Sequence, residues 1–267
     1  MATFDKSVLD RNATQYATRV KRGDVGRYVL LPGDPDRVGR IGKHLDDVRE
    51  IAACREFVTI TGTYRGVTVS VTSTGVGCPS ASIAVEELIN AGATHFIRVG
   101  STAALQPNIN TGDIVINTAI YRNDGTSRMY VPDTYPAVAD HFFAHSLIKS
   151  AQRRQASGGY ELHVGLSSCD DAFYAETPEW IAKLSQLGML NVEMEGSAIF
   201  TVAQLRGVSA AMVCGVSGNL VVADYDYEEG EHGNQRLVDA WENAISIALE
   251  AIVAHDAEHF ADSPFVP

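Results

Sequence analysis

Tyr28-Val-Leu-Leu-Pro-Gly-Asp-Pro-Asp-Arg-Val-Gly-Arg40 is the stretch that best defines the fold. Its apolar run 29–32 predicts a buried strand, Gly33 lets the backbone approach a ligand closely, and the two prolines fix the turn. Arg37, just past the turn, offers a planar guanidinium that suits phosphate. A surface turn with a solvated arginine would look the same in isolation. The interpretation as a strand that delivers an anion-binding loop therefore depends on the rest of the chain.

The size and composition predict one globular domain over residues 1–267. No linker or charge block divides the 267 residues, and 45% hydrophobic with 20% charged residues is an ordinary globular balance. Residues 1–27 are weakly periodic, so we expect a loop or short helix that packs late or across a subunit boundary. No apolar run approaches the ~20 residues that cross a membrane, and the first residues lack the pattern of a signal peptide. A soluble cytoplasmic protein is expected.

The charge and the cysteines exclude several classes of partner and cofactor. The formal net charge of −12 disfavours nucleic acid and anionic membranes, because both are bound through clustered Lys and Arg. The four cysteines form no CxxC pair, so neither a disulfide framework nor a zinc site is predicted, and reduced core thiols are expected. The cysteines are Cys54, Cys78, Cys169 and Cys214.

Two pairs of histidines have the spacing of neighbours on a helix face. They are His141 with His145 and His255 with His259. Neither pair has a third ligand or the glutamate of an HExxH motif. We therefore expect both pairs to be exposed to solvent, and we predict no metal site.

Strands and helices alternate along the chain, which predicts an α/β architecture with a mixed, mainly buried central sheet flanked by helices. Further strands are expected at 54–61, 67–73, 95–104, 113–117, 162–166, 190–195 and 208–216, and the strand in 95–104 is expected to end in a Gly-Ser-Thr turn. Helices are expected at 38–48, 81–90, 138–152, 178–187, after 195 up to 206, and at 237–259. The strands 54–61 and 67–73 are expected to form a hairpin through residues 62–66.

Residues 73–80, Ser-Thr-Gly-Val-Gly-Cys-Pro-Ser, form a second glycine-rich loop between a strand and a helix. Such a loop is typical of anion binding at a helix N-terminus. It is not a dinucleotide fingerprint, because Ser80 replaces the third glycine and no acidic residue follows at the expected distance. A bound nicotinamide or flavin dinucleotide is not expected.

Arg98 lies inside an apolar strand and needs a partner, since an unpaired buried charge costs several kcal/mol. Arg37 and Arg98 each stand near glycine and a small hydroxyl residue. This arrangement predicts one phosphate-sized site that the Ser101 hydroxyl and backbone N–H groups complete. The alternative is that Arg98 pairs with a carboxylate of the core.

Glu193 and Glu195 flank Met194 at a predicted strand end. The period of two in a strand directs both carboxylates to one face. Two such carboxylates suit the vicinal hydroxyls of a ribose or a general acid/base pair. Their apolar neighbours indicate that they are partly buried. No P-loop, nucleophile elbow or catalytic Cys/His context is found, so covalent catalysis is not indicated.

Together these motifs resemble the nucleoside phosphorylase-I family, which includes uridine phosphorylases, hexameric purine nucleoside phosphorylases and nucleosidases. The resemblance spans Leu31 to about Val216. Its motifs are 31–38 (LPGDPDRV), 55–57 (REF), 73–80 (STGVGCPS), 82–88 (SIAVEEL), 98–101 (RVGS), 112–113 (GD), 135–140 (YPAVAD) and 192–195 (VEME). The segments 82–88 and 136–140 favour the uridine enzymes, whereas 61–66 (TGTYRG) favours the purine enzymes.

The resemblance implies a distorted, barrel-like sheet and a phosphorolysis in which inorganic phosphate attacks C1′ of the ribose. It implies phosphate contacts from Gly33, Arg37, Arg98, Ser101 and a neighbouring subunit's Arg55, ribose contacts from Glu193, Met194 and Glu195, and base contacts from Thr102, Phe173, Thr177 and Asn219. Arg98, Glu195 and Arg37 would carry the catalysis. Neither a metal nor an organic cofactor is implied. A structural monovalent cation near Glu56, Val76 and Ser80 and a homohexamer built from dimers would fit the family.

The sequence departs from the family where the nucleoside would be read. The N-terminal ribose-binding histidine is absent, with Gln15 or Tyr16 nearest, and Thr177 and Glu179 replace the Gln and Arg that read uracil. Gly218 replaces the catalytic Asp of the purine enzymes.

These departures leave base specificity open, but the missing acid at position 218 favours uridine over a purine. Glu176 or Glu179 would then accept from uracil N3–H, and Ser217 or Asn219 would donate to a carbonyl. The alternatives are a purine nucleoside phosphorylase, a nucleosidase and a nucleoside-binding protein without turnover. The arginine set argues against a nucleosidase, which uses water in place of phosphate.

Overall fold

The computed structural model describes residues 13–222, 224–225 and 235–260. Its strands are β1 Tyr28–Leu31, β2 Asp46–Cys54, β3 Phe57–Tyr64, β4 Val67–Thr72, β5 His95–Ala104, β6 Ile114–Asn123, β7 Ala137–Val138, β8 Leu162–Asp170, β9 Asn191–Glu193, β10 Ser209–Asn219 and β11 Asp224–Tyr225. Its helices are α1 Pro35–Gly42, α2 Cys78–Ala91, α3 Thr126–Tyr130, α4 His141–Gly158, α5 Pro178–Gln186, α6 Gly196–Arg206 and α8 Gln235–His259, with a short 3₁₀ turn η2 at Phe173–Ala175.

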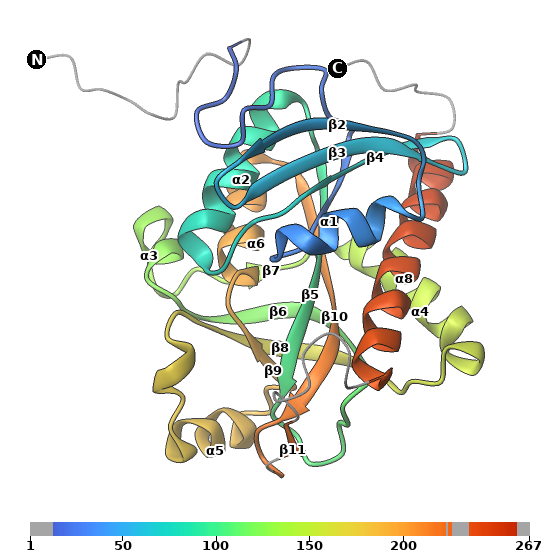
Figure 1. Ribbon diagram of the computed structural model, residues 1–267. Helices are drawn as coiled ribbons and strands as arrows, with labels where there is room; N and C mark the ends of the chain where they lie inside the picture. The colour runs from blue at the N-terminus through green and yellow to red at the C-terminus, as the bar shows by residue number, and fades with distance from the viewer. Residues whose placement is uncertain (1–12, 223, 226–234, 261–267) are drawn as a thin grey trace, which may run out of the picture.

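These strands form one mixed sheet that closes on itself. The order along the sheet is β11-β10-β6-β8-β9-β5-β1-β4-β3-β2, and β10 also pairs with β5. The strands β10, β6, β8, β9 and β5 therefore form a closed, barrel-like ring, and the other main strands extend it beyond β5. Figure 1 shows β5 and β10 side by side through the middle of the molecule. The predicted α/β fold with a barrel-like mixed sheet is confirmed.

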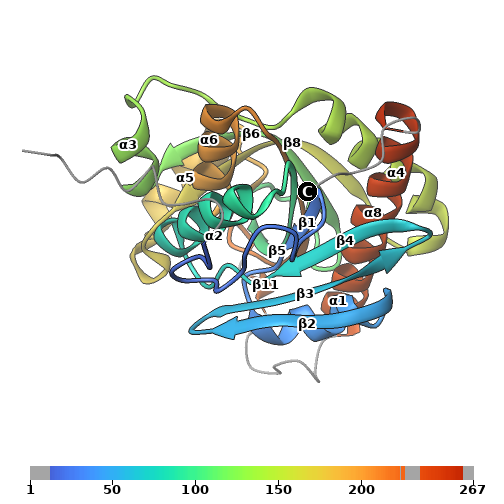
Figure 2. The same ribbon diagram turned by 90° about the horizontal axis from the view of Figure 1, so that it is seen from above.

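Helices cover the two sides of this sheet. Seen from above, α4 and α8 lie on one side of the ring, and α2 and α6 lie on the other (Figure 2). The sheet needs helices on both sides because the apolar side chains of its strands, such as β1, alternate between the two faces. Tyr28 and Leu30 pack in the core with α4 and α8, whereas Val29 and Leu31 pack in the core with α2 and α6. None of the described helices combines the length and the apolar character needed to cross a bilayer.

The largest error of the sequence prediction lies at residues 38–54. The helix expected at 38–48 ends at Gly42, and β2 begins at Asp46. This strand is mostly exposed and pairs with β3 within the described residues, so its polar side chains carry no signal of burial. Arg55, with φ of +56°, then turns the chain into β3, where a single strand over 54–61 was expected. The predicted hairpin is confirmed, and its turn lies at Arg65 and Gly66.

The other predicted elements are found with shifted ends. The strand within 95–104 is found, but the turn expected at Gly100-Ser101-Thr102 is wrong, because β5 continues through these residues to Ala104. The strands expected at 113–117 and 162–166 extend to Asn123 and Asp170. Residues 13–27 contain neither a helix nor a strand, and residues 1–12 lie outside the described part of the chain. Cys78, Cys169 and Cys214 are buried free thiols as expected, whereas Cys54 is only half-buried.

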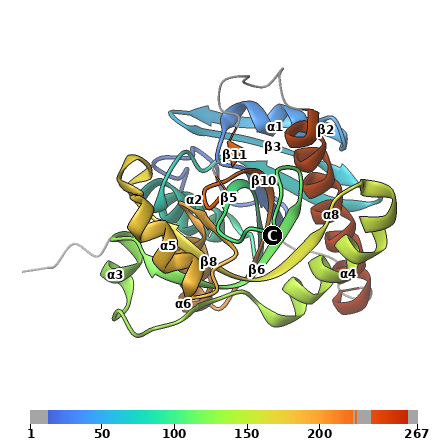
Figure 3. The ribbon, with the colours of Figure 1, turned by 90° about the horizontal axis from the view of Figure 1, so that it is seen from below.

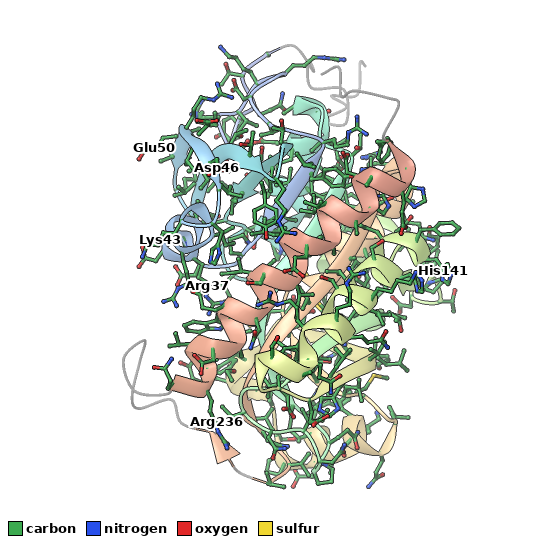
Figure 4. All side chains as sticks on the ribbon, turned by 90° about the vertical axis from the view of Figure 1, so that its right-hand side faces the viewer. Arg37, Lys43, Asp46, Glu50, His141 and Arg236 are labelled. Carbon is green, nitrogen blue, oxygen red and sulfur yellow. The ribbon has the colours of Figure 1, made fainter. Side chains whose placement is uncertain are left out.

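The expectation for the histidines is half right. His141 and His145 are exposed on α4, and Figure 4 shows His141 at the outer face of that helix. On α8, His259 is exposed but His255 is only 4% exposed. The prediction for His255 is wrong because the same spacing of four also fits a helix face that packs on an aromatic cluster.

Candidate active site

A cavity of about 590 Å³ is lined by residues of β5, β9 and β10 and by the segments that follow β1, β4, β8 and β9. The strand β9 runs antiparallel to β5, so the segment after β9 turns back along β5 toward Arg98. Figure 3, a view from below, shows β5 and β10 between α5 on one side and α8 on the other. The cavity is lined by Gly33, Asp34, Pro35, Arg37, Glu56, Gly75, Val76, Arg98, Gly100, Ser101, Thr102, Ala103, Phe173, Glu176, Val192, Glu193, Met194, Glu195 and Ser217.

Most of the predicted site residues meet in this cavity, although they come from distant parts of the chain. Those that line it are Gly33, Arg37, Arg98, Ser101, Thr102, Phe173, Glu193, Met194 and Glu195. Three predicted residues do not line it, namely Arg55, Thr177 and Asn219. The cavity thus unites the two glycine-rich loops, the half-buried Arg37, the buried Arg98 and the pair of glutamates.

The first glycine-rich loop brings Arg37 to the cavity. Asp34 caps α1 by accepting a hydrogen bond from the backbone N–H of Asp36 (2.9 Å), which fixes the start of the helix. One turn later, Arg37 donates to the Ser101 hydroxyl (3.2 Å). Its guanidinium also lies 4.3 Å from the ring centroid of Trp241 on α8, and Figure 4 shows Arg37 beside that helix. Hydroxyl and aromatic contacts leave the charge of Arg37 without a carboxylate partner among the described residues.

The second glycine-rich loop lies against the first. Gly75 donates its N–H to the carbonyl of Gly33 (2.9 Å). Gly75 has a φ of +71°, and a Cβ there would come 2.6 Å from Cγ of Glu56, so only glycine fits. Gly77 then donates its N–H to Oε1 of Glu195 (2.6 Å). The predicted anion-binding loop therefore binds a protein carboxylate in this structure.

Arg98 is buried between the two glutamates. Its Nε donates to Oε2 of Glu193 (2.8 Å), and its Nη2 forms an ion pair with Glu195. Burial alone would lower the pKa of Arg98, but the carboxylates of Glu195 and Glu193 raise it. The buried Nη1 has no hydrogen-bond partner among the described residues. Both alternatives for Arg98 are thus compatible, because it pairs with carboxylates and retains a donor for an anion.

Glu193 and Glu195 do not project from one strand face as predicted. The strand β9 ends at Glu193, and Glu195 occupies the N-cap position of α6. They converge because Glu193 folds back and accepts the backbone N–H groups of Glu195 and Gly196 (both 2.9 Å). Burial raises the pKa of Glu195, and the charge of Arg98 opposes that shift. Glu193 holds Arg98 and the start of α6. Glu195 uses one oxygen for the N–H of Gly77 and the other for the ion pair with Arg98.

The other end of the cavity is less polar. Phe173 is 44% exposed beside it, and Ser217 donates its hydroxyl to the carbonyl of Thr102 (3.1 Å). The Thr102 hydroxyl donates to the carbonyl of Val192 (2.6 Å), so this side chain is largely committed to the fold. Glu176 also lines this end, and burial together with the nearby Asp170 raises the pKa of Glu176 to about 7. The expected base contacts of Thr102 and Phe173 are consistent with their positions.

Thr177 and Asn219 are placed elsewhere, which corrects the expectation that they contact the base. Thr177 is exposed at the N-cap of α5 and accepts from the backbone N–H of Trp180 (3.2 Å). Asn219 is fully buried and donates to the carbonyls of Gln106 and Ile109 (2.8 and 2.7 Å). Its Oδ1 accepts from a loop N–H at 2.8 Å. Its hydrogen-bonding groups therefore connect the segment after β5 with the loop that follows β10.

Arg55 and the N-terminal segment lie outside the cavity. Arg55 is exposed in the turn between β2 and β3, with its guanidinium 5.7 Å from the ring centroid of Tyr16. Gln15 is buried and accepts from the side chain of Asn90 (3.1 Å). Buried Glu87, on α2, accepts the backbone N–H groups of residues 17 and 18 and so fixes this segment. Neither Gln15 nor Tyr16 reaches the cavity of its own chain.

Sequence reasoning missed Trp241 as part of the site. It was identified only as one residue on the apolar face of the last helix, and no local motif links it to Arg37 more than 200 residues away. The one available signal is Arg37 itself, because an arginine that stays charged next to apolar residues favours stacking on an aromatic ring.

A cluster of Cys78, Asp124 and Asp171 has the spacing of metal ligands. Its carboxylates are already committed, however. Asp124 accepts from the Ser127 N–H (2.6 Å) and from the hydroxyl of Ser197, and Asp171 accepts from the Gly125 N–H (2.7 Å). The donor groups around this cluster therefore stabilise it without an ion.

Comparison with known proteins agrees with this site. The model of the phosphorylase superfamily matches residues 27–254. The chain therefore belongs to the phosphorylase superfamily, and the resemblance found in the sequence is confirmed.

Individual relatives match over most of their length. The chain is 42% identical to a uridine phosphorylase of Thermococcus kodakarensis over 249 residues, which cover 88% of this chain and 87% of that protein. It is 38% identical to a guanosine phosphorylase of Halorubrum lacusprofundi over 240 residues, covering 88% and 96%. The crystal structure of uridine phosphorylase from Vibrio fischeri superposes with a TM-score of 0.81 at 34% identity, covering 91% of this chain and 98% of that one.

Proposed function

We propose that this protein is a nucleoside phosphorylase, a pentosyltransferase that cleaves the N-glycosidic bond of a nucleoside with inorganic phosphate. The products are the free base and ribose 1-phosphate, and the preferred nucleoside is uridine. The observation that carries the proposal is Arg98, which is held by two glutamates and keeps a buried donor beside the Arg37–Ser101 pair, with no partner among the described residues. An anion with several oxygens fits such a set of donors.

In this proposal the protein contributes positioning and electrostatics. Arg37, Arg98, Ser101 and the backbone at Gly33 hold phosphate, while Glu195 and Met194 hold the ribose. The fixed guanidinium groups orient the nucleophile toward C1′ at no further cost in reorganisation. Glu195 would accept from the ribose hydroxyls with the lone pairs that Arg98 and Gly77 leave open. These contacts strengthen as the sugar approaches an oxocarbenium ion.

Uridine is supported by the names of several relatives and by the residue at position 218. A purine leaving group is helped by protonation at N7, and Gly218 offers no acid. The second candidate is guanosine, which is favoured by the 38% identity to a guanosine phosphorylase that the chain covers almost completely.

The test is an incubation of the protein with uridine, guanosine, inosine and adenosine, with and without phosphate, followed by chromatography of base and sugar phosphate. We expect uracil and ribose 1-phosphate to form only with phosphate. Free ribose in phosphate-free buffer would identify a nucleosidase, and binding without products a nucleoside-binding protein. Inosine or adenosine cleaved about ten times faster than uridine would make this a purine enzyme.

We also propose that the protein is a homo-oligomer built from dimers, with a hexamer as the full assembly. Support comes from Arg55, which is exposed, stands near Tyr16 and does not line the cavity of its own chain. Mixing inactive Arg55→Ala with inactive Arg98→Ala subunits should restore some activity if Arg55 completes a neighbour's site. No recovery despite proven subunit exchange would contradict the shared site.

Three further features remain proposals. No organic cofactor is required by the reaction as written. A monovalent cation near Glu56, Val76 and Ser80 would have a structural role at a subunit boundary. A cytoplasmic location and a role in nucleotide salvage would fit activity on nucleosides and phosphate.

A further inference from the structure

The end of the cavity near Phe173 contains a carboxyl group that the proposed binding of phosphate and ribose does not use. Glu176 follows η2 and lines the cavity together with Phe173, Thr102 and Ser217. Glu193 and Glu195 also line it, but both engage Arg98. Within the described residues, the carboxyl of Glu176 forms neither a hydrogen bond nor an ion pair. It is therefore available to a ligand.

A second carboxylate, that of Asp170, lies near Glu176 and is held in place by two hydrogen bonds. Asp170, at the end of β8, accepts from the Ser168 hydroxyl (2.5 Å) and from the indole N–H of Trp180 (2.6 Å). It is the charged group that acts on Glu176 from the neighbouring strand. The other ionisable groups that line the cavity are Asp34, Arg37, Glu56, Arg98, Glu193 and Glu195. No Lys or Arg of the described residues neutralises Glu176.

We propose that Glu176 is the residue that reads the hydrogen-bonding edge of the base. An ionised carboxylate only accepts hydrogen bonds, so it selects bases that present N–H groups at that edge. Uracil presents N3–H, and guanine presents N1–H with its 2-amino group. Cytosine and adenine present a bare ring nitrogen, which would face the carboxylate without a proton. The inference rests on the proposed function and names the substrate class as 4-oxopyrimidine and 6-oxopurine nucleosides.

The same geometry makes the selection depend on pH. Burial and Asp170 raise the pKa of Glu176 to about 7, so the carboxyl gains a proton as the pH falls below 7. A protonated carboxyl donates one hydrogen bond and can satisfy the bare ring nitrogen of cytosine or adenine. Discrimination against these bases should therefore be strong at pH 8 and weak at pH 6.

The variant Glu176→Gln tests this assignment, because glutamine both accepts and donates and does not titrate. In the wild type, we expect the ratio of kcat/KM for uridine to that for cytidine to fall about tenfold between pH 8 and pH 6. Because the ratio compares two nucleosides, the titration of phosphate itself cancels. In the variant, the ratio should be lower by about 10- to 100-fold at pH 8 and independent of pH.

The matched control is Glu179→Gln, which removes an exposed carboxylate three residues later that does not line the cavity. It should leave the ratio and its pH dependence unchanged. The KM for phosphate should be unchanged in both variants, which distinguishes loss of base reading from loss of the folded site. The proposal is overturned if Glu176→Gln keeps the wild-type uridine-to-cytidine ratio of kcat/KM or its wild-type dependence on pH. It is also overturned if Glu179→Gln lowers this ratio or removes its dependence on pH.

Binding of free bases separates this proposal from the proposed function. Calorimetric titration with uracil, guanine and cytosine at pH 6 and pH 8 needs no turnover. If uracil binds more weakly to Glu176→Gln than to the wild type at pH 8, Glu176 reads the base even in a protein that cleaves no nucleoside. Equal affinities for both proteins, or no binding of any base to the wild type, overturn the proposal whether or not uridine is cleaved.

Discussion

His95 and Arg98 lie three residues apart on β5, and the two positions solve the problem of a buried cationic side chain in opposite ways. Both are nearly buried, at 8% and 4% exposure. Because a strand alternates its faces, His95 points toward α4 and α8 and Arg98 points toward α6. Arg98 meets two carboxylates, whereas His95 meets the rings of Tyr28, Phe143 and His255, with centroids 5.1 to 5.4 Å away.

The difference follows from what each side chain can do with its proton. Burial, together with His255, lowers the pKa of His95 to about 4, so at neutral pH the imidazole is uncharged and needs only the Thr94 hydroxyl (2.8 Å). A guanidinium cannot be deprotonated in this way. Arg98 therefore requires Glu193 and Glu195, and both of these partners line the cavity. A permanent charge in a core requires a network around it, and here that network is the candidate site.

The largest expected effect comes from Arg98→Ala, which leaves two carboxylates buried without their cation. Loss of phosphate contacts in a closed site should lower kcat/KM for phosphate by about a thousandfold. The free energy of unfolding should fall by about 3–5 kcal/mol, because breaking a buried ion pair exposes the cost of the remaining charges. Steady-state kinetics and denaturant unfolding measure the two effects.

Arg98→Lys is the matched variant for this change. It keeps the charge but not the planar fork, so it should recover stability better than activity. Wild-type use of phosphate by Arg98→Ala would refute the role of Arg98 and reduce the network to a structural feature.

A smaller effect separates the two glutamates. Glu195→Gln keeps an acceptor for the Gly77 N–H but loses the charge, so kcat should fall by about 100-fold with little change in unfolding. Glu193→Gln loses acceptor capacity for Arg98 and the start of α6, so it should lower the free energy of unfolding by about 1–3 kcal/mol. Comparison of kcat with thermal unfolding for the pair tests this assignment. Equal loss of kcat and stability in both variants would contradict the division of roles.

The sequence predicted the phosphate end of the site better than the base end, and the reason is physical. Gly33 and Arg37 follow β1, Arg98 and Ser101 lie within β5, and the pairing of β1 with β5 brings the four residues to one cavity. Thr177 and Asn219 were assigned by their place in a motif, but both bond to backbone groups, Thr177 to the N–H of Trp180 and Asn219 to the carbonyl of the distant Gln106. Such bonds depend on loop geometry, which a sequence pattern does not specify.

The fold shows the same limit. Buried strands such as 95–104 are evident from their apolar residues, whereas exposed β2 carries a polar sequence that also suits a helix. His255 was misplaced because its burial depends on ring contacts with side chains far away in the chain. Such contacts exist only after the layers have packed.

The smallest effect is expected at the other face of β5, from His95→Phe. In the folded protein the pKa of His95 is about 4, below its ordinary value of 6.5, so its contribution to stability is present above pH 6.5. That contribution is lost as the pH falls from 6.5 toward 4, because the unfolded chain takes up the proton first. The loss across this window should be about 1–3 kcal/mol for this one imidazole. Phenylalanine fits the aromatic cluster and does not titrate, so the variant should show a shallower decline in unfolding free energy between pH 6.5 and 4.

A residual slope should remain in His95→Phe, because burial also lowers the pKa of His255 in the same cluster. The control His141→Asn removes an exposed histidine of α4 and should leave the wild-type slope unchanged. Near neutral pH, His95→Phe should cost about 1 kcal/mol through the lost bond to Thr94. It should also retain phosphorolysis, since His95 faces away from the cavity. If His95→Phe declined as steeply with acid as the wild type, the imidazole would already be charged in the fold, and the contrast with Arg98 would fail.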